Sequence, residues 1–197
     1  MSFYQFAKNV VKIVLKPKYK VKEMGLENIP KTGGPVIICS NHISNYDPPI
    51  VGMTCPRDIY FMAKEELFEN KLFGFILRNV HAFPIKRGGM TDRNALRQGL
   101  EVLKDGNVLG LFPEGTRSKT GEIKKGLAGA GFFALRSQAT IVPCAIIGQY
   151  KSKEPLLVVY GSPVEMESLR KNKASAQEVT DVIMNEIKKI QEKHLDL

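Results

Sequence analysis

A chain of 197 residues is long enough to form one domain with a buried core. Its composition, 43% hydrophobic and 25% charged residues, excludes a disordered or low-complexity protein. The formal net charge of +9 is uneven, because residues 1–22 carry six lysines and no acidic residue, whereas the other 175 residues carry 23 basic and 20 acidic ones. Since the folded body is nearly balanced in charge, we do not expect a nucleic-acid-binding groove.

The N-terminal segment has the pattern of a basic amphipathic helix. One side of such a helix would carry the apolar residues Phe3, Phe6, Ala7, Val10, Ile13 and Val14, and the opposite side would carry Lys8, Lys12 and Lys16. This pattern suits an anionic membrane surface, and the alternative is a helix packed on its own domain with the lysines in water. We therefore divide the chain into a membrane-surface segment, residues 1–22, and an α/β domain, residues 23–197. The longest stretch without a charged residue has 15 residues, which is too short for a helix that spans a bilayer.

From residue 35 onward, short β-rich runs alternate with stretches of helical periodicity. The predicted strands are Val36–Cys39, Asp58–Met62, His81–Ile85, Asn107–Phe112, Ile141–Ile147 and Leu156–Tyr160. The predicted helices are Lys64–Leu77, Asp92–Lys104, Leu127–Arg136 and Ala176–His194. Several strand runs are apolar on both faces, as in a sheet covered by helices on both sides. The alternation predicts an α/β fold with a largely parallel or mixed central sheet.

Polar residues follow the first predicted strand directly, and ligands of such folds gather at the carboxyl ends of strands. His42 comes five residues before Asp47 in this loop. If the loop turns, the carboxylate can bind one imidazole nitrogen and leave the other to accept a proton. That arrangement is a general base without its own nucleophile, so a substrate hydroxyl would be the nucleophile. The alternative is that Asp47 caps a helix that begins at Pro48.

Two further clusters carry groups that bind anions. The turn from Pro113 to Ser118 combines glycine, hydroxyl groups and an arginine, and the segment from Phe83 to Gly89 places Lys86 and Arg87 before two glycines. Taken alone, the first is equally consistent with a capped turn and the second with a solvated loop.

Together and in this order, these residues resemble the glycerolipid acyltransferase family. The resemblance rests on four motifs: Asn41-His42-x-Ser44-x-x-Asp47, Phe83-Pro84-x-Lys86-Arg87, Phe112-Pro113-Glu114-Gly115-Thr116-Arg117-Ser118 and Ile141-Val142-Pro143. It extends from about Leu26 to Gly161 and is strongest for members that acylate 1-acylglycerol 3-phosphate. Cys144 stands where the family usually has a bulkier apolar residue. We expect this difference to affect the fit of the acyl chain and not the chemistry.

The resemblance implies an activity and a role for each matching residue. The enzyme would move a fatty acyl group from an acyl thioester to the sn-2 hydroxyl of lysophosphatidate and give phosphatidate. His42 would deprotonate the hydroxyl, and Asp47 would orient His42. Arg87 and Arg117 would hold the phosphate, Lys64 would lie near the catalytic pocket, and the acceptor pocket would be lined by Glu114, Gly115 and Thr116, with Glu114 bound to a glycerol hydroxyl.

The expected partners follow from that activity. They are lysophosphatidate, an acyl thioester donor carried by coenzyme A or an acyl carrier protein, and an anionic membrane surface bound through residues 1–22. No cofactor or metal ion is expected, because no Cys/His spacing suits zinc. Without a visible secretory signal, we expect a peripheral protein on the cytoplasmic face of the membrane, with reduced cysteines. We interpret Cys39 as a buried strand residue and not as a nucleophile.

Three alternatives remain at this point. The acceptor could be glycerol 3-phosphate or another lysolipid, because the motifs separate these poorly. Water could replace the acceptor in a thioester or lipid hydrolase, although the chain has no Gly-x-Ser-x-Gly motif. The chain could also bind anionic lipid without catalysis. The sequence does not specify the donor carrier, the acyl chain length or the oligomeric state.

Overall fold

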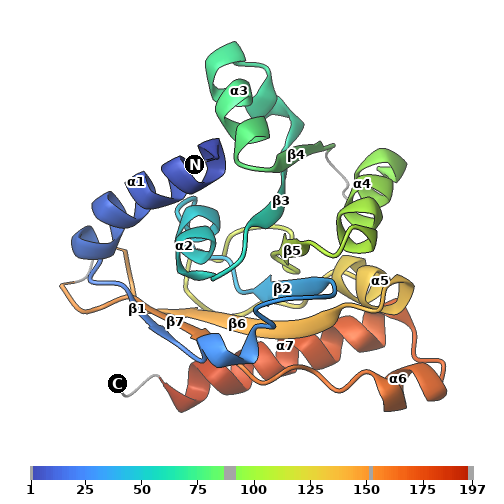
Figure 1. The fold of residues 1–197 in the computed structure, drawn as a ribbon. Coiled ribbons are helices and arrows are strands. Elements are labelled where there is room, and N and C mark those ends of the chain that lie inside the picture. The colour runs from blue at the N-terminus through green and yellow to red at the C-terminus, as the bar shows by residue number, and fades with distance from the viewer. Residues whose placement is uncertain (1, 87–91, 151–152, 195–197) are drawn as a thin grey trace.

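The computed structural model describes residues 2–86, 92–150 and 153–194 (Figure 1). Within these residues, seven strands form one sheet in the order β1-β7-β6-β2-β5-β3-β4. Their bounds are β1 (Lys22–Met24), β2 (Val36–Ser40), β3 (Ile59–Lys64), β4 (Ala82–Ile85), β5 (Val108–Leu111), β6 (Thr140–Ile147) and β7 (Leu157–Tyr160). The strands from β6 to β4 in this order are parallel, whereas β7 pairs antiparallel with β6, and β1 pairs parallel with β7. The expected α/β fold with a largely parallel sheet is confirmed.

Helices cover both faces of the sheet and create two hydrophobic layers. The helical segments are α1 (Phe3–Lys18), η1 (Leu26–Asn28), α2 (Asp47–Thr54), η2 (Glu65–Phe68), α3 (Lys71–Asn79), α4 (Arg93–Lys104), α5 (Gly129–Arg136), α6 (Glu167–Lys171) and α7 (Ala176–Lys193). Val36 and Ile38 of β2 pack in the layer of α1 and α2, and Ile37 and Cys39 pack in the layer of α4, α5 and α7. Figure 1 shows α7 on one side of the sheet and α1 and α2 on the other. The central strand is therefore apolar at successive positions because both of its faces are covered.

The six predicted strands are all present, with ends that differ by one or two residues. The predicted helix over Lys64–Leu77 is instead a short 3-10 turn followed by α3, because Asn70 caps a new helix by accepting a hydrogen bond from the Phe73 amide at 2.9 Å. The sequence did not predict β1 or α6. Both are short, and β1 is an edge strand with two charged residues among its three, so neither carries a clear periodic pattern.

Helix α1 packs on the domain, but its apolar stripe does not face the domain. Tyr4 and Leu15 are buried, and the Tyr4 hydroxyl accepts a hydrogen bond from the Ile59 amide at 2.9 Å. On the same side, Lys8 donates to the Cys55 carbonyl at 2.6 Å, and its burial lowers the pKa of its ammonium group. The helix therefore packs on the domain through one side, while Phe6, Val10, Ile13 and Val14 of its predicted apolar side are exposed. None of the helices in the described residues combines the length and apolar character needed to span a bilayer.

Candidate active site

The candidate site lies where the chain leaves two neighbouring strands in opposite directions. Strands β2 and β5 are adjacent and parallel, so both end at the same edge of the sheet. After β2 the chain continues into α2, in one hydrophobic layer, whereas the helix after β5 is α5, in the other layer. Such a divergence leaves a crevice at the carboxyl ends of the strands, where α/β proteins bind their ligands. His42 and Glu114 both follow these strand ends directly.

The loop after β2 turns sharply and brings the Asp47 carboxylate back onto His42. Asp47 Oδ2 lies 2.6 Å from His42 Nδ1 and also accepts hydrogen bonds from the amides of Ile43 at 2.6 Å and Ser44 at 2.7 Å. Asp47 is the first residue of α2 and does not cap it, and proline follows at once, as is favoured in a first helical turn. The carboxylate is fully buried, so these donors compensate for its loss of hydration. The predicted contact between the two side chains is present.

The contact with Asp47 fixes which imidazole nitrogen can accept a proton. A carboxylate accepts hydrogen bonds, so Nδ1 carries the hydrogen and Nε2 has the free lone pair. Nε2 has no hydrogen-bond partner among the described residues, and the His42 side chain is 17% exposed. The ring stacks on Phe112 with centroids 4.3 Å apart, and Phe112 stacks on Phe61 at 5.9 Å. The imidazole is therefore held by its neighbours while one nitrogen stays available.

Glycine at position 110 makes this stack of rings possible. A Cβ atom at Gly110 would lie 2.2 Å from the Phe61 ring. Gly110 pairs with Phe61 across β5 and β3, so the missing side chain leaves space for the ring over the strand.

The second oxygen of Asp47 binds Tyr150, which the sequence analysis did not identify. The Tyr150 hydroxyl donates to Asp47 Oδ1 at 2.7 Å. Burial and the nearby Asp47 charge raise the pKa of Tyr150, so the phenol stays protonated and remains a donor. Tyr150 follows β6, the other strand beside β2. Tyr150 therefore also follows the carboxyl end of a central strand, where ligands gather in such folds. A single tyrosine at such a position, however, does not by itself indicate a functional residue.

Glu114 and Asn41 fix the backbone around His42. Glu114 is buried, and its two oxygens accept hydrogen bonds from the amides of His42 at 2.8 Å and Lys124 at 3.1 Å. The Ser118 amide donates to the His42 carbonyl at 2.7 Å. On the opposite side, the Asn41 side chain binds both the amide and the carbonyl of Ile146, at 2.7 and 3.0 Å. Glu114 thus has a clear structural task, while its expected hydrogen bond to a glycerol hydroxyl stays a prediction.

Of the other expected substrate-binding residues, the structure describes Lys64, Gly115, Thr116 and Arg117, which lie at or after the carboxyl ends of strands. Gly115, Thr116 and Arg117 are exposed on the turn after β5. Lys64 is exposed at the end of β3, opposite Ile85 in β4, and one strand, β5, separates β3 from β2. The pairing of β3 with β5 ends at Phe61, three residues before Lys64, so Lys64 lies beyond the part of β3 that is bonded to the centre of the sheet. Arg87 lies outside the described residues.

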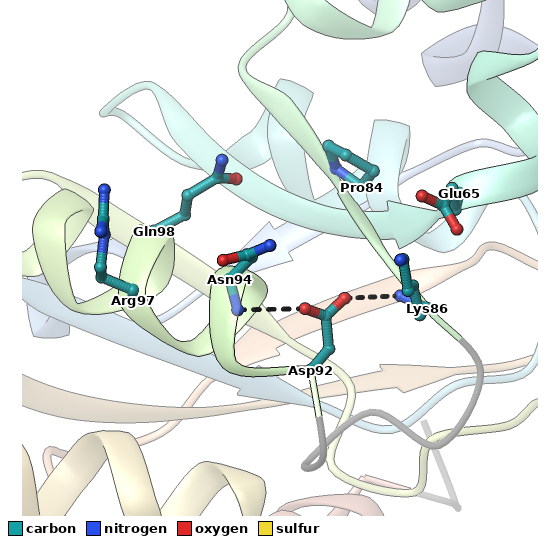
Figure 2. Close-up of a pocket in the computed structure, with 7 residues that line it drawn as sticks. All are labelled: Glu65, Pro84, Lys86, Asp92, Asn94, Arg97 and Gln98. Atoms are coloured by element: carbon teal, nitrogen blue, oxygen red, sulfur yellow. Dashed lines mark hydrogen bonds between the residues drawn. The ribbon is translucent and has the colours of Figure 1, made fainter.

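The Asp92 carboxylate forms hydrogen bonds both to the residue after β4 and to the first turn of α4. Its carboxylate accepts from the Lys86 amide at 2.9 Å and from the amides of Asn94 and Ala95 at 3.1 and 3.2 Å, and these bonds lower its pKa. Asp92 lines a hollow, drawn in Figure 2, whose volume is about 200 Å³. The hollow is lined by Glu65, Pro84, Lys86, Asp92, Asn94, Arg97 and Gln98. It contains neither member of the His42–Asp47 pair and no residue of the turn after β5, so it is not part of that arrangement.

Cys39 is unsuited to act as a nucleophile beside His42. It is fully buried, and burial raises the pKa of its thiol to about 12. Its side chain packs in the layer of α4, α5 and α7, whereas α2, which carries Asp47, lies in the other layer. The interpretation of Cys39 as a buried strand residue is confirmed.

Comparison with known proteins places these features in a family. The sequence profile of the acyltransferase family matches residues 20–147. The chain is 31% identical to a 1-acyl-sn-glycerol-3-phosphate acyltransferase of Bacillus subtilis, over 96% of this chain and 98% of that protein. It is also 31% identical to a chloroplast 1-acyl-sn-glycerol-3-phosphate acyltransferase of Arabidopsis thaliana, over 76% of this chain and 42% of that protein.

A solved structure supports the same fold. The crystal structure of a 1-acyl-sn-glycerophosphate acyltransferase from Thermotoga maritima superposes with a TM-score of 0.74 and 23% sequence identity. The match covers 98% of this chain and 78% of the Thermotoga protein.

Proposed function

Because this chain belongs to the acyltransferase family, we propose that it transfers a fatty acyl group from an acyl thioester to the sn-2 hydroxyl of 1-acylglycerol 3-phosphate, giving phosphatidate. The observation that carries the proposal is the His42–Asp47 pair at the end of β2, with Nδ1 bound to the carboxylate and Nε2 without a partner among the described residues. Such a pair suits removal of a proton from a substrate hydroxyl.

The proposed reaction has one nucleophile, the acceptor hydroxyl. Nε2 of His42 accepts its proton while the oxygen attacks the thioester carbonyl, and Asp47 stabilises the positive imidazole. Collapse of the tetrahedral intermediate breaks the carbon–sulfur bond. The imidazole then returns its proton to the leaving thiolate, so that an ester and a free thiol are formed. The carrier is coenzyme A or an acyl carrier protein.

We assign the acceptor phosphate to arginine. Arg117 is exposed on the turn whose backbone contacts His42, and its guanidinium can bind a phosphate with two parallel hydrogen bonds. Lys64, at the end of β3, and Arg87, which lies outside the described residues, complete the proposed basic set. Gly115 and Thr116 line the acceptor pocket with Glu114 in this proposal. Gly115 has a φ of +65°, and a Cβ there would lie 2.7 Å from Leu127, so a larger residue would disturb the turn.

We place the enzyme as a peripheral protein at the cytoplasmic face of the membrane, bound through residues 1–22. The lipid acceptor resides in that membrane, and Phe6, Val10, Ile13 and Val14 of α1 are exposed. A basic amphipathic helix of this kind lies in the interface of an anionic bilayer.

The proposal is tested by thiol release from an acyl thioester in detergent, with lysophosphatidate added or withheld. Cys39, Cys55 and Cys144 are buried, so a thiol-reactive dye detects mainly the released carrier thiol. We expect release only with the acceptor, together with formation of phosphatidate. Release without any acceptor would indicate a hydrolase, and no release from either donor would leave a lipid-binding protein without catalysis. Faster thiol release with glycerol 3-phosphate than with lysophosphatidate would show that glycerol 3-phosphate is the preferred acceptor.

The phosphate assignment has its own test. Loss of a charge-assisted contact in Arg117→Ala should raise the KM for lysophosphatidate roughly 10- to 100-fold and leave the KM for the thioester nearly unchanged. Lys119→Ala removes an exposed positive charge two residues further along the same loop and serves as the control. Equal changes in both KM values of Arg117→Ala would contradict a phosphate role.

A further inference from the structure

Helix α3 presents the reverse of the usual pattern for a surface helix. Its only buried residue is Gly74, whereas four large apolar side chains are exposed. These are Leu72, Phe73, Phe75 and Ile76, and Leu67 of the preceding turn is exposed as well. An amphipathic helix of a soluble domain turns such residues toward the core. A cluster of exposed apolar residues is typical of an interaction surface.

Contacts with η2 fix this orientation of α3. A Cβ at Gly74 would lie 2.7 Å from the Phe68 carbonyl oxygen, so the glycine allows the helix to approach the turn closely. The Arg78 guanidinium lies 5.3 Å from the centroid of the buried Phe68 ring, and Asn70 caps the helix. The side of α3 that faces the domain is therefore already occupied, and the apolar residues are left on the other side.

The exposed side of α3 is continuous with that of α1. The rings of Phe3 and Phe75 meet edge to face with centroids 6.2 Å apart, and Figure 1 shows the start of α1 close to α3. The exposed apolar residues of α1 are Phe3, Phe6, Val10, Ile13 and Val14. We call these residues, together with the four of α3, the α1–α3 surface.

The charges around the α1–α3 surface indicate what covers it. Neither helix contains an acidic residue, and exposed basic residues flank the apolar side chains: Lys12, Lys18, Lys71 and Arg78. Acidic residues that contact α1 include Asp58, bound to Gln5 at 2.5 Å, and Glu23, paired with Lys16 at 2.6 Å. Before α3, Glu65, Glu66 and Glu69 belong to η2 and the residue after it. Apolar side chains bordered by lysine and arginine suit the interface of an anionic bilayer, where the side chains enter the acyl region and the charges meet the headgroups.

We propose that α3 docks on the anionic membrane together with α1, so that the enzyme is held by two helices from separate parts of the chain. The proposal rests on the proposed function, which places the acceptor lipid in that membrane. Two contacts that are not collinear fix the tilt of a protein on a surface, whereas one helix alone allows rotation about its axis. The second helix therefore sets how the carboxyl edge of the sheet faces the lipid.

The chain contains no tryptophan, so a single introduced tryptophan reports on one position. Leu72 in α3 and Ile13 in α1 form a matched pair, because they are 72% and 73% exposed. The third variant, Asn185→Trp, places the probe on α7, across the sheet from α1. Each variant is mixed with vesicles of phosphatidylglycerol and phosphatidylcholine, with or without bromine on the acyl chains, and circular dichroism checks that it is folded.

We expect brominated lipid to quench Leu72→Trp and Ile13→Trp to a similar extent, each with a blue shift in emission, and to leave Asn185→Trp unchanged. Quenching of Ile13→Trp alone would overturn the proposal, since α1 would then bind without α3. It would also be overturned by a lack of quenching at both positions. A blue shift of Leu72→Trp without vesicles, with dimers in analytical ultracentrifugation, would show that a second copy covers the surface. These mixtures contain no acyl donor, so thiol release by the wild-type protein in detergent tests the chemistry separately.

Discussion

The surroundings of the His42–Asp47 pair and the α1–α3 surface show opposite patterns of burial. At the pair, a charged carboxylate is fully buried, and each of its oxygens has a hydrogen-bond donor. At the α1–α3 surface, large apolar side chains are exposed, although the same helices bury a tyrosine, a leucine and a glycine against the domain. Both patterns oppose the usual distribution, in which charged residues are exposed and apolar residues are buried. Within the described part of the chain, only the buried carboxylate has partners that compensate for its unusual position.

This difference indicates which parts of the function the protein completes alone. In the proposed reaction the pair is already positioned for its substrates, because its geometry is fixed by Glu114, Asn41 and Tyr150. The α1–α3 surface gains its stabilisation from a partner that covers it. Substitutions at the pair should therefore change turnover whether the acceptor is supplied in detergent or in vesicles. Substitutions at the α1–α3 surface should change binding to vesicles.

The largest effect is expected for Asp47→Asn, which removes the charge and keeps the shape. The amide can still meet the loop amides with its oxygen and the Tyr150 hydroxyl with its NH2 group, so the protein should fold. Without the carboxylate, the positive imidazole is no longer stabilised, and we expect kcat to fall by about 10² to 10⁴. The measurements are thiol release in detergent and the melting temperature, with Asp181→Asn at an exposed position of α7 as the control. A rate within about threefold of the wild type, on this scale of general-base effects, would contradict the role of the pair.

Leu72→Ser should weaken binding to anionic vesicles without lowering the melting temperature. Insertion of a leucine side chain into an apolar phase contributes about 1.5–3 kcal/mol, so the loss should be roughly 10- to 100-fold in the partition coefficient. The side chain is 72% exposed in the free protein, and its removal therefore costs little stability. Met24→Ser, at an exposed apolar residue of β1, is the matched control in vesicle sedimentation. Equal binding of both variants would remove α3 from the interface.

Tyr150→Phe tests whether the tyrosine positions Asp47. Loss of one hydrogen bond of about 1 kcal/mol should lower kcat/KM roughly fivefold. The acid limb of the pH profile should move to higher pH, because a carboxylate with one donor fewer stabilises the protonated imidazole more strongly. Tyr19→Phe changes the neighbouring ring, 4.9 Å away, and serves as the control. A purely structural role for Tyr150 would lower the rate without moving the pH profile.

The smallest effect is expected for Lys12→Gln on the exposed side of α1. A lysine near an anionic membrane contributes about 1 kcal/mol, so vesicle binding should weaken roughly fivefold at low salt. The difference should shrink at high salt because the charges are then screened. Lys104→Gln, at an exposed position of α4, should leave binding unchanged. A Lys12→Gln effect that is independent of salt would argue against an electrostatic contribution.

The sequence predicted the six longer strands because their apolar runs are continuous. The spacing of His42 and Asp47 allowed their contact only if the chain turned between them, and the resemblance to the acyltransferase family implied it. The sequence did not predict Tyr150, whose bond to Asp47 joins residues 103 positions apart, and it could not show that Glu114 holds the His42 amide across 72 positions. Helical periodicity identified the apolar side of α1. It could not tell whether that side faces the domain, because periodicity groups residues without orienting the helix.

The most direct test of the account is thiol release by His42→Ala in detergent with lysophosphatidate, beside the wild type and Cys39→Ala. Removal of the base should lower acceptor-dependent release by about 10² to 10⁴, while a folded state is confirmed by the melting curve. Cys39→Ala should keep most of the activity, because its thiol is buried in the other hydrophobic layer. Wild-type release by a folded His42→Ala protein would contradict the assignment of the base and, with it, the proposed reaction.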